Sequence, residues 1–333
     1  MRYWVFPLFS AFLFASFTSA LVVGSVKIAP HDVFLYLTGF KRDSSLLSVV
    51  VDIRLIRTFA ALLTGFSLGI AGALLQSLFR NPLADPFVLG VSSGSSLAIA
   101  ATLVLGIGLG HMTAYDPYAL YFAAAAGAVA TSFLVIGLSS LTRTIVGLVL
   151  AGVMIGYLNA GLTTLIVTTS DVEIMRAFSF WTLGSFSAAK WSVLEKVLPF
   201  LSVGFVVSLF AAKPLNALAF GDDAASSMGV WVKGARVMSV AAASAVVAAA
   251  TVVSGPVGFI GLASPHLARY LSNTSDNRVI IPLAGLAGAT IGIVADIAAR
   301  NIMPPLDLPI TAITSIFGAP LIILLLVRGG KLT

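Results

Sequence analysis

The chain has 333 residues, of which 59% are hydrophobic and only 10% are charged, and its mean hydropathy is +1.05. Soluble domains carry roughly 25% charged residues, and so few charges could not cover a water-soluble globule of this length. The composition therefore excludes a soluble enzyme, a nucleic-acid-binding domain and a disordered chain. The net charge of +6 fits basic side chains that anchor a protein in a lipid bilayer, and no nucleic-acid partner is expected.

Apolar runs separated by charged, proline and glycine clusters predict ten membrane-spanning helices. Ten spans of about 20 residues occupy about 200 residues, so residues 1–333 are expected to form a single, all-α transmembrane domain. The first run could instead be a cleaved signal peptide, but it is long enough to span the bilayer, and a retained helix is expected. In chain order the predicted helices lie at 4–26, 56–79, 87–109, 118–140, 145–168, 193–213, 235–254, 257–271, 279–299 and 309–328.

Three connections between these helices are long enough to carry function. Residues 27–53 are polar and mixed in charge, and the aromatic residues within 169–192 predict a short helix at the membrane interface. In the third connection, residues 214–234, two short helices are expected at a bend on the inner face. With the N-terminus inside, the basic loop residues divide almost equally between the two sides, so the positive-inside rule hardly decides the orientation.

The sequence contains no group that predicts chemistry by the chain itself. Lys331 follows two glycines but lacks the rest of a phosphate-binding loop, so no nucleotide hydrolysis is expected here. The three histidines are scattered without carboxylates at metal-ligand spacing, and cysteine is absent. A hydrogen-bonded structural role is expected for His266. The chain is therefore expected to be neither an enzyme nor the holder of a metal or cofactor.

One aspartate lies inside a predicted span. Asp296 precedes Arg300 by four residues, on the same face of the predicted helix, and the two side chains could form a structural ion pair. An ionisable group at such depth can also serve a proton pathway. The second interpretation corresponds to an ion-coupled secondary transporter, which is the alternative function that these residues allow.

The connection at 214–234 has the pattern of a short exposed helix. Gly221 precedes Asp222 and Asp223, whose carboxylates can cap a helix N-terminus, and Gly229 can close the turn that follows. A short helix with a face of small residues suits a groove on a partner protein. From the residues alone, a solvated connector is an equal alternative.

The segment Asp-Ala-Ala-x-x-x-Gly at 223–229 is similar to the Glu-Ala-Ala-x-x-x-Gly signature of ABC-importer membrane subunits, with aspartate in place of glutamate. Further motifs stand in order along residues 54–330, and together they resemble the FecCD-type permeases, which import ferric siderophores, haem or vitamin B12. These motifs are Arg54-Leu55-Ile56-Arg57-Thr58, Arg80-Asn81-Pro82-Leu83-Ala84-Asp85-Pro86, Phe180-Trp181-Thr182-Leu183-Gly184-Ser185, Gly255-Pro256-Val257-Gly258-Phe259, Pro265-His266-Leu267-Ala268-Arg269 and Phe317-Gly318-Ala319-Pro320.

The resemblance implies a bundle like that of type II ABC importers, in the cytoplasmic membrane of a bacterium or archaeon. It implies a homodimer or a paired half, two cytoplasmic ATPase subunits that bind ATP and Mg, and a periplasmic or surface substrate-binding protein. Transport would proceed by alternating access, in which short coupling helices transmit the closure of the ATPase pair to the membrane helices. The cargo would be an iron chelate, haem or cobalamin.

The resemblance also assigns roles to particular residues. ATPase coupling is carried over to Asp222, Asp223, Ala224, Ala225 and Gly229. In the family's vitamin B12 importers, arginines at matching positions meet acidic residues of the binding protein, which here implies docking by Arg54, Arg57 and Arg300. Simple interfacial anchoring is the alternative for the first two. Reversal of Arg54 and Arg57 to glutamate is expected to weaken docking without unfolding the chain.

Overall fold

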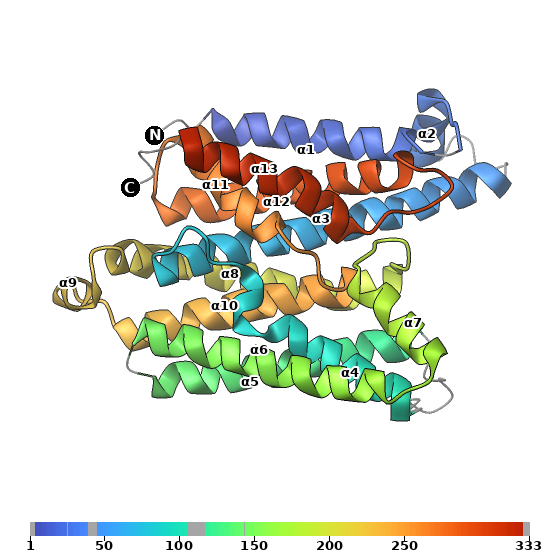
Figure 1. Ribbon diagram of the computed structural model, residues 1–333. Coiled ribbons are helices and arrows are strands. Elements are labelled where there is room, and N and C mark those ends of the chain that lie inside the picture. Colours follow the sequence, from blue (N-terminus) through green and yellow to red (C-terminus); the bar gives the residue numbers. More distant parts are fainter. Residues whose placement is uncertain (1–3, 25, 39–44, 106–116, 143, 329–333) are drawn as a thin grey trace.

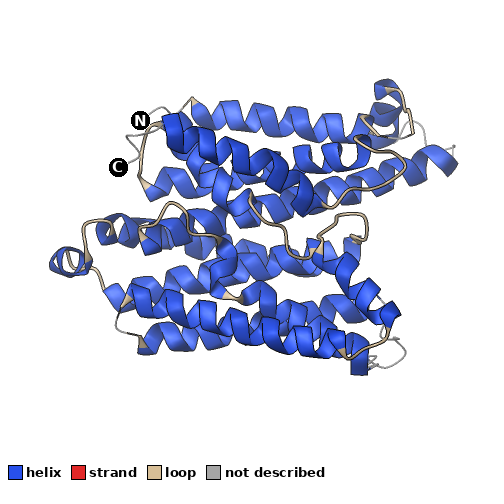
Figure 2. Cartoon of the chain, in the orientation of Figure 1, coloured by secondary structure: helices blue, strands red, loops and turns tan. Residues whose placement is uncertain are grey.

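The computed structural model describes residues 4–24, 26–38, 45–105, 117–142 and 144–328, and these ranges contain helices and loops but no strand (Figures 1 and 2). The all-helical prediction is therefore confirmed for the described residues. The helices are α1 (Val5–Val22), α2 (Pro30–Leu37), α3 (Ser45–Phe79), η1 (Pro86–Leu89, a 3-10 helix), α4 (Val91–Leu105), α5 (Pro117–Leu141), α6 (Ile145–Thr168), α7 (Val172–Thr182), α8 (Trp191–Leu218), α9 (Asp222–Ser227), α10 (Val232–Ser254), α11 (Ile260–Ser272), α12 (Asn277–Asn301) and α13 (Ile310–Arg328).

Each of the ten predicted spans corresponds to a helix, and seven of the described helices are long and apolar enough to cross a membrane. The short helix predicted within 169–192 is confirmed as α7, and its place at the membrane interface stays a prediction. Residue 25, residues 106–109 of the third predicted span, and Lys331 lie outside the described residues.

Two boundaries differ from the prediction by five residues or more. Helix α3 begins at Ser45 rather than at 56, because Arg54 turns its charge onto backbone carbonyls instead of interrupting the helix. Helix α8 continues through Pro214 to Leu218, since proline removes one N–H donor and a helix held by its neighbours can accept that loss. The connection at 214–234 therefore contains one short helix, α9, and the expectation of two is wrong.

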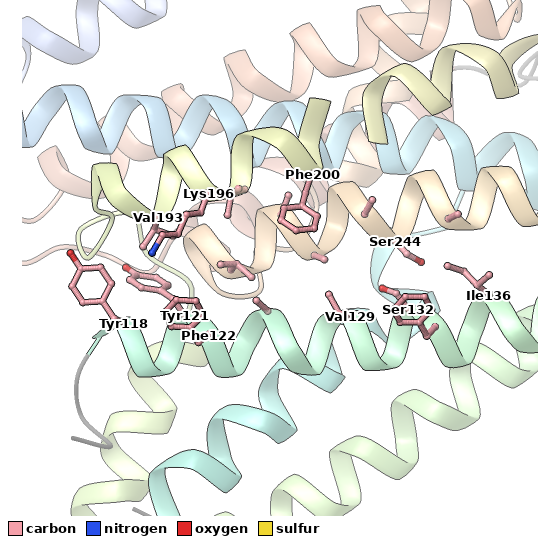
Figure 3. A pocket seen from close by; sticks show the side chains of 18 residues that line it. Tyr118, Tyr121, Phe122, Val129, Ser132, Ile136, Val193, Lys196, Phe200 and Ser244 are labelled. Carbon is pink, nitrogen blue, oxygen red and sulfur yellow. The ribbon is translucent and has the colours of Figure 1, made fainter. Parts of the chain in front are cut away.

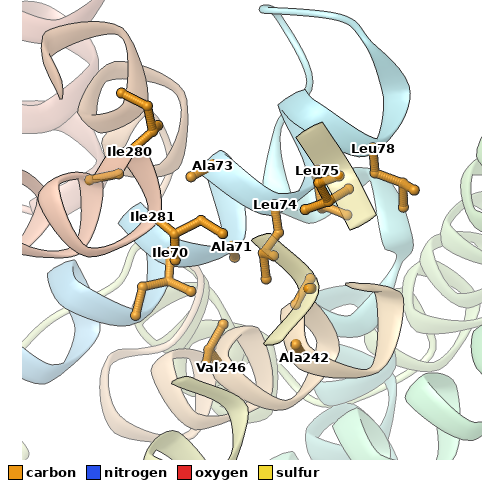
Figure 4. Close-up of a cluster of buried hydrophobic side chains, with 14 of the residues drawn as sticks. Ile70, Ala71, Ala73, Leu74, Leu75, Leu78, Ala242, Val246, Ile280 and Ile281 are labelled. Carbon is orange, nitrogen blue, oxygen red and sulfur yellow. The ribbon is translucent and has the colours of Figure 1, made fainter. Parts of the chain in front are cut away.

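Helix α3 lies at the centre of the bundle, between α12, α11 and α10. Gly65 and Gly69 face α12 so closely that an added Cβ would overlap the backbone carbonyls of Gly288 and Ala284. Small residues allow membrane helices this approach, so these glycines serve helix packing. Around this contact, Ile70 and Leu74 of α3 join buried side chains of α10 and α12 (Figure 4).

The bundle has two distinct ends (Figure 1). Helix α9 projects at the end where α1 begins and α13 ends, and this is called the inner end. Helices α2 and α7 lie at the opposite end, which is called the outer end. The two sets of residues expected to meet partner proteins lie on the elements of these two ends.

Candidate functional site

Two glycines shape the connection that carries α9. Gly221 has φ +110° and Gly229 has φ +82°, a left-handed region that glycine adopts without the steric cost that a Cβ imposes. They turn the chain out of α8 and back into α10. The N-cap of α9 is Gly221, with Asp222 and Asp223 in the first turn. The two carboxylates therefore interact with the positive end of the helix dipole through their charge alone. Because the N-cap residue is Gly221, the expectation that they cap the helix is wrong.

Asp222 links α9 to two membrane helices. One carboxylate oxygen accepts a hydrogen bond from Arg80, just after the end of α3, with 2.9 Å between Nη2 and Oδ1. The other oxygen pairs with Arg236 of α10, whose side chain is buried. These residues are far apart in the sequence, and the pairing has no periodic signal that could have revealed it. The two ion pairs therefore connect α9 to the end of α3 and to α10.

Large apolar side chains are exposed on either side of α9, although it lies at the end of the bundle. Phe220 and Trp231, which flank the helix, are 74% and 76% exposed, and Met228 and Leu83 are exposed beside them. Large exposed apolar groups in one place mark interaction surfaces. Among the five residues assigned to coupling, Asp223 and Gly229 are exposed, Asp222 and Ala224 are half-buried, and Ala225 is buried. No observation tests their coupling role, which stays a prediction.

Replacement of Asp222 by asparagine should uncouple α9 without unfolding the chain. Single side chains modulate the coupling between sites by roughly 0.5–2 kcal/mol, so ATP-driven uptake should fall by roughly two- to thirtyfold. The Arg80–Asp222 pair is half-exposed and contributes only about 0–1 kcal/mol to stability. The asparagine oxygen can still accept a hydrogen bond from the buried Arg236, so the melting temperature should fall only slightly. Lys233→Gln is the control, because Lys233 is exposed near α9, lies outside the residues assigned to coupling and forms none of the ion pairs of the described residues. Equal uptake by the two variants would contradict the link.

At the outer end, an ionic cluster brings together residues from α3, α12 and the loop that follows α12. Asp296 is fully buried and accepts a hydrogen bond from Arg57 at 2.6 Å, while Arg300 lies 3.1 Å from its second oxygen. Arg57 also donates to Asp307 at 2.7 Å. The predicted Asp296–Arg300 pair is therefore present, as part of a larger network. Asp296 lies between two cations, and this arrangement does not favour the ion-coupled alternative.

The same cluster holds the end of α1. Arg54 donates to the carbonyls of Leu21 and Val22 at 2.8 and 2.9 Å, and Arg300 donates to the carbonyl of Ala20 at 2.9 Å. The last carbonyls of a helix lack partners within the helix, and cations are favoured there. The guanidinium groups thus complete the C-terminus of α1.

The three arginines assigned to docking are between 5% and 9% exposed. Their docking role is untested and stays a prediction. The accompanying expectation that reversal of Arg57 leaves the fold intact conflicts with this burial, because a glutamate there would face Asp296 and Asp307. Three carboxylates would then share a largely buried site, which is strongly unfavourable.

The described residues contain no group of three or more histidine, cysteine, aspartate or glutamate side chains placed to hold a metal ion. His266 lies within 2.9 Å of the carbonyl oxygen of Pro82, with Nε2 as its polar contact. This contact joins α11 to the turn after α3, in agreement with the structural role expected from the sequence. The features that stand out are thus two ends suited to protein contacts, on a bundle of apolar helices.

Such an arrangement is that of a multi-pass membrane protein, with seven of the described helices long and apolar enough to cross a bilayer. Residues 12–328 match the model of the FecCD transport family, and the chain belongs to this family. It is therefore a multi-pass transport permease of the cytoplasmic membrane.

Three known proteins illustrate the likeness. The chain is 33% identical to the hemin transport system permease protein HmuU of Yersinia pestis, over 92% of each chain. It is 35% identical to the vitamin B12 import system permease protein BtuC of Escherichia coli, over 85% of this chain and 84% of the relative. A solved ABC transporter described as of the metal-chelate type, in an inward-facing conformation, matches 97% of this chain and 98% of its own, with a TM-score of 0.83 and 26% identity.

Proposed function

We propose that the chain is the permease subunit of a binding-protein-dependent ABC importer for an iron chelate such as a ferric siderophore, for haem or for cobalamin. Membership of the FecCD family supports the transport class, and relatives named for hemin and vitamin B12 support the cargo class. The observation that carries the proposal is α9, which is flanked by exposed Phe220 and Trp231 at the inner end and is joined through Asp222 to α3 and α10.

In the complete importer, two copies of the chain would enclose the translocation pathway. Two ATPase subunits would bind at the inner ends, and ATP with Mg would be held and hydrolysed there. When the ATPase pair closes, each α9 would be displaced, and Asp222 would pass the displacement to Arg80 and Arg236. The work of this chain is thus mechanical: it changes which end of the pathway is open.

At the outer end, the proposal retains Arg54, Arg57 and Arg300 as candidates for docking of the binding protein. Their three positive charges exceed the two negative charges of Asp296 and Asp307 in the same cluster. The cluster itself would thus carry one net positive charge, which favours an acidic group of the partner placed close to it. Docking that weakens as ionic strength rises would support this role.

Reconstitution tests the proposed function. The chain is placed in proteoliposomes with its ATPase inside and the cargo-loaded binding protein outside, and uptake of the cargo is measured. Uptake should require both ATP and the binding protein, and the ATPase should co-purify with the permease. Uptake driven by an ion gradient without the ATPase would overturn the proposal in favour of a secondary transporter. The ligand retained by the binding protein on purification identifies the cargo.

A further inference from the structure

A groove of about 460 Å³ lies between α5, α8 and α10, away from the two ends just described (Figure 3). Aromatic rings of α5 and α8, among them Phe122, Phe133 and Phe200, form its sides. Small residues of α10, including Ala241, Ala245 and Ala248, form part of its wall. Along most of its length the groove therefore presents hydrocarbon.

One end of the groove is basic and rich in aromatic hydroxyl groups. The Lys196 ammonium lies 5.1 Å from the ring centre of Phe122, and the Lys190 ammonium lies 4.2 Å from that of Tyr118. Tyr118 and Tyr121 stand at the same mouth (Figure 3). Among the described residues, no acidic side chain forms an ion pair with either lysine. Glu195 is next to Lys196 in the helix, and adjacent helical residues do not face each other.

The basic mouth lies at the depth of lipid headgroups. Tyr118 and Tyr121 belong to the first turn of α5, and Trp191, which is 40% exposed, begins α8. Tyrosine and tryptophan gather at the membrane–water interface, where the long side chain of a lysine such as Lys196 can extend its charge toward the headgroups. The groove thus runs from the outer interface into the hydrocarbon.

The length of the groove suits an acyl chain. At about 1.5 Å per helical residue, the segment 118–133 rises roughly 22 Å, whereas one leaflet contributes about 15 Å of hydrocarbon. The polar wall residue Ser132 lies near the deep end of this segment, and its hydroxyl donates to the carbonyl of Ala128 at 2.7 Å. Below Lys196 the wall of the groove therefore carries no charge over the whole depth of one leaflet.

We propose that this groove binds a phospholipid of the outer leaflet that carries an anionic headgroup. Its acyl chain lies along α5, α8 and α10, and its phosphate lies against Lys196 and Lys190. A second copy of the chain fits less well, because apolar side chains packed over Lys196 would bury its charge without a partner. The assignment to the outer leaflet rests on the proposed function, in which α9 faces the ATPase on the inner side, whereas the groove itself does not depend on the cargo.

The headgroup contact is tested with the full-length permease in nanodiscs, with spin-labelled phosphatidylglycerol and phosphatidylcholine of matched chains as probes. The wild type should retain phosphatidylglycerol in preference to phosphatidylcholine. Lys196→Ala should reduce that preference about fivefold, which corresponds to roughly 1 kcal/mol for one basic side chain near a membrane surface. Lys213→Ala, an exposed lysine near the inner end of the same helix, is the control and should leave the preference unchanged.

The acyl-chain contact is tested with a bulky residue in the wall. Ala125→Phe should fill the groove and abolish retention of either lipid, whereas Ala126→Phe, an exposed neighbour on α5 outside the lining, should not. Equal lipid retention by Ala125→Phe and Ala126→Phe would overturn the proposal, and so would the absence of a headgroup preference in the wild type. Since the chain has no cysteine, a single Phe133→Cys substitution also reports on a second copy. Disulfide cross-linking between copies through this position would likewise overturn it.

Discussion

Gly229→Arg should abolish ATP-driven uptake while the folded permease remains in the membrane. Gly229 is exposed, and nothing lies within 4 Å of a Cβ built on it, so the fold has room for a side chain. The left-handed backbone at φ +82° adds a cost of roughly 1–2 kcal/mol for a residue with a Cβ. The arginine itself would project where α9 meets the proposed ATPase. Uptake and co-purification of the ATPase measure the effect, and immunoblotting of membranes measures the amount of permease.

Gly229→Ala separates the cost of the left-handed backbone from the effect of the arginine side chain on the contact. Alanine imposes the same backbone cost without the bulk or charge, so most uptake should remain. If Gly229→Arg transports as well as the wild type, α9 is not the coupling element. If alanine and arginine abolish uptake equally, the backbone conformation matters rather than the contact surface.

Asp296→Asn should lower the free energy of unfolding by roughly 3–5 kcal/mol, the cost of leaving buried charges without their partner. Arg57 and Arg300 both face this carboxylate, which is fully buried between α3 and α12. Without its charge, three arginines would share the cluster with Asp307 alone. Thermal melting of the purified permease in detergent measures the loss, and a lower yield in membranes should accompany it.

Two further variants define the cause of that loss. Asp296→Asn combined with Arg300→Gln removes one charge of each sign and should recover part of the stability. Asp307→Asn is the matched control: its side chain is 42% exposed, so its pair with Arg57 should contribute no more than about 1 kcal/mol. A loss at Asp307 as large as that at Asp296 would contradict the role of burial.

The positions of the helices could be predicted from the sequence because a bilayer requires long apolar runs, and these are local features. The prediction failed where local polarity was misleading. Asp52 and Arg54 interrupt the apolar run at the start of α3, but the Arg54 charge is satisfied by carbonyls of α1, more than thirty residues earlier. The helix therefore continues through a segment that looks like a loop.

The ionic contacts likewise divide into those that the sequence predicts and those that it does not. The Asp296–Arg300 pair could be predicted, because four residues in a helix bring side chains to one face. The partners Arg57 and Asp307, and the link between Arg80 and Asp222, are separated by more than 100 residues. Such pairs form only when the helices pack, and no spacing in a single sequence reveals them. The short motif around α9 located the site, but not the contacts that hold it.

The length of α3 has a mechanical consequence. At about 1.5 Å per residue, its 35 residues extend roughly 52 Å. Arg80 and Asp222 act at one extremity, Arg57 and Asp296 lie toward the other, and Gly65 and Gly69 make their close backbone contacts with α12 near the midpoint. A straight rod that pivots at its middle moves its two extremities in opposite directions. A force applied at α9 that tilts α3 one way on the inner side would therefore swing the arginines the opposite way on the outer side.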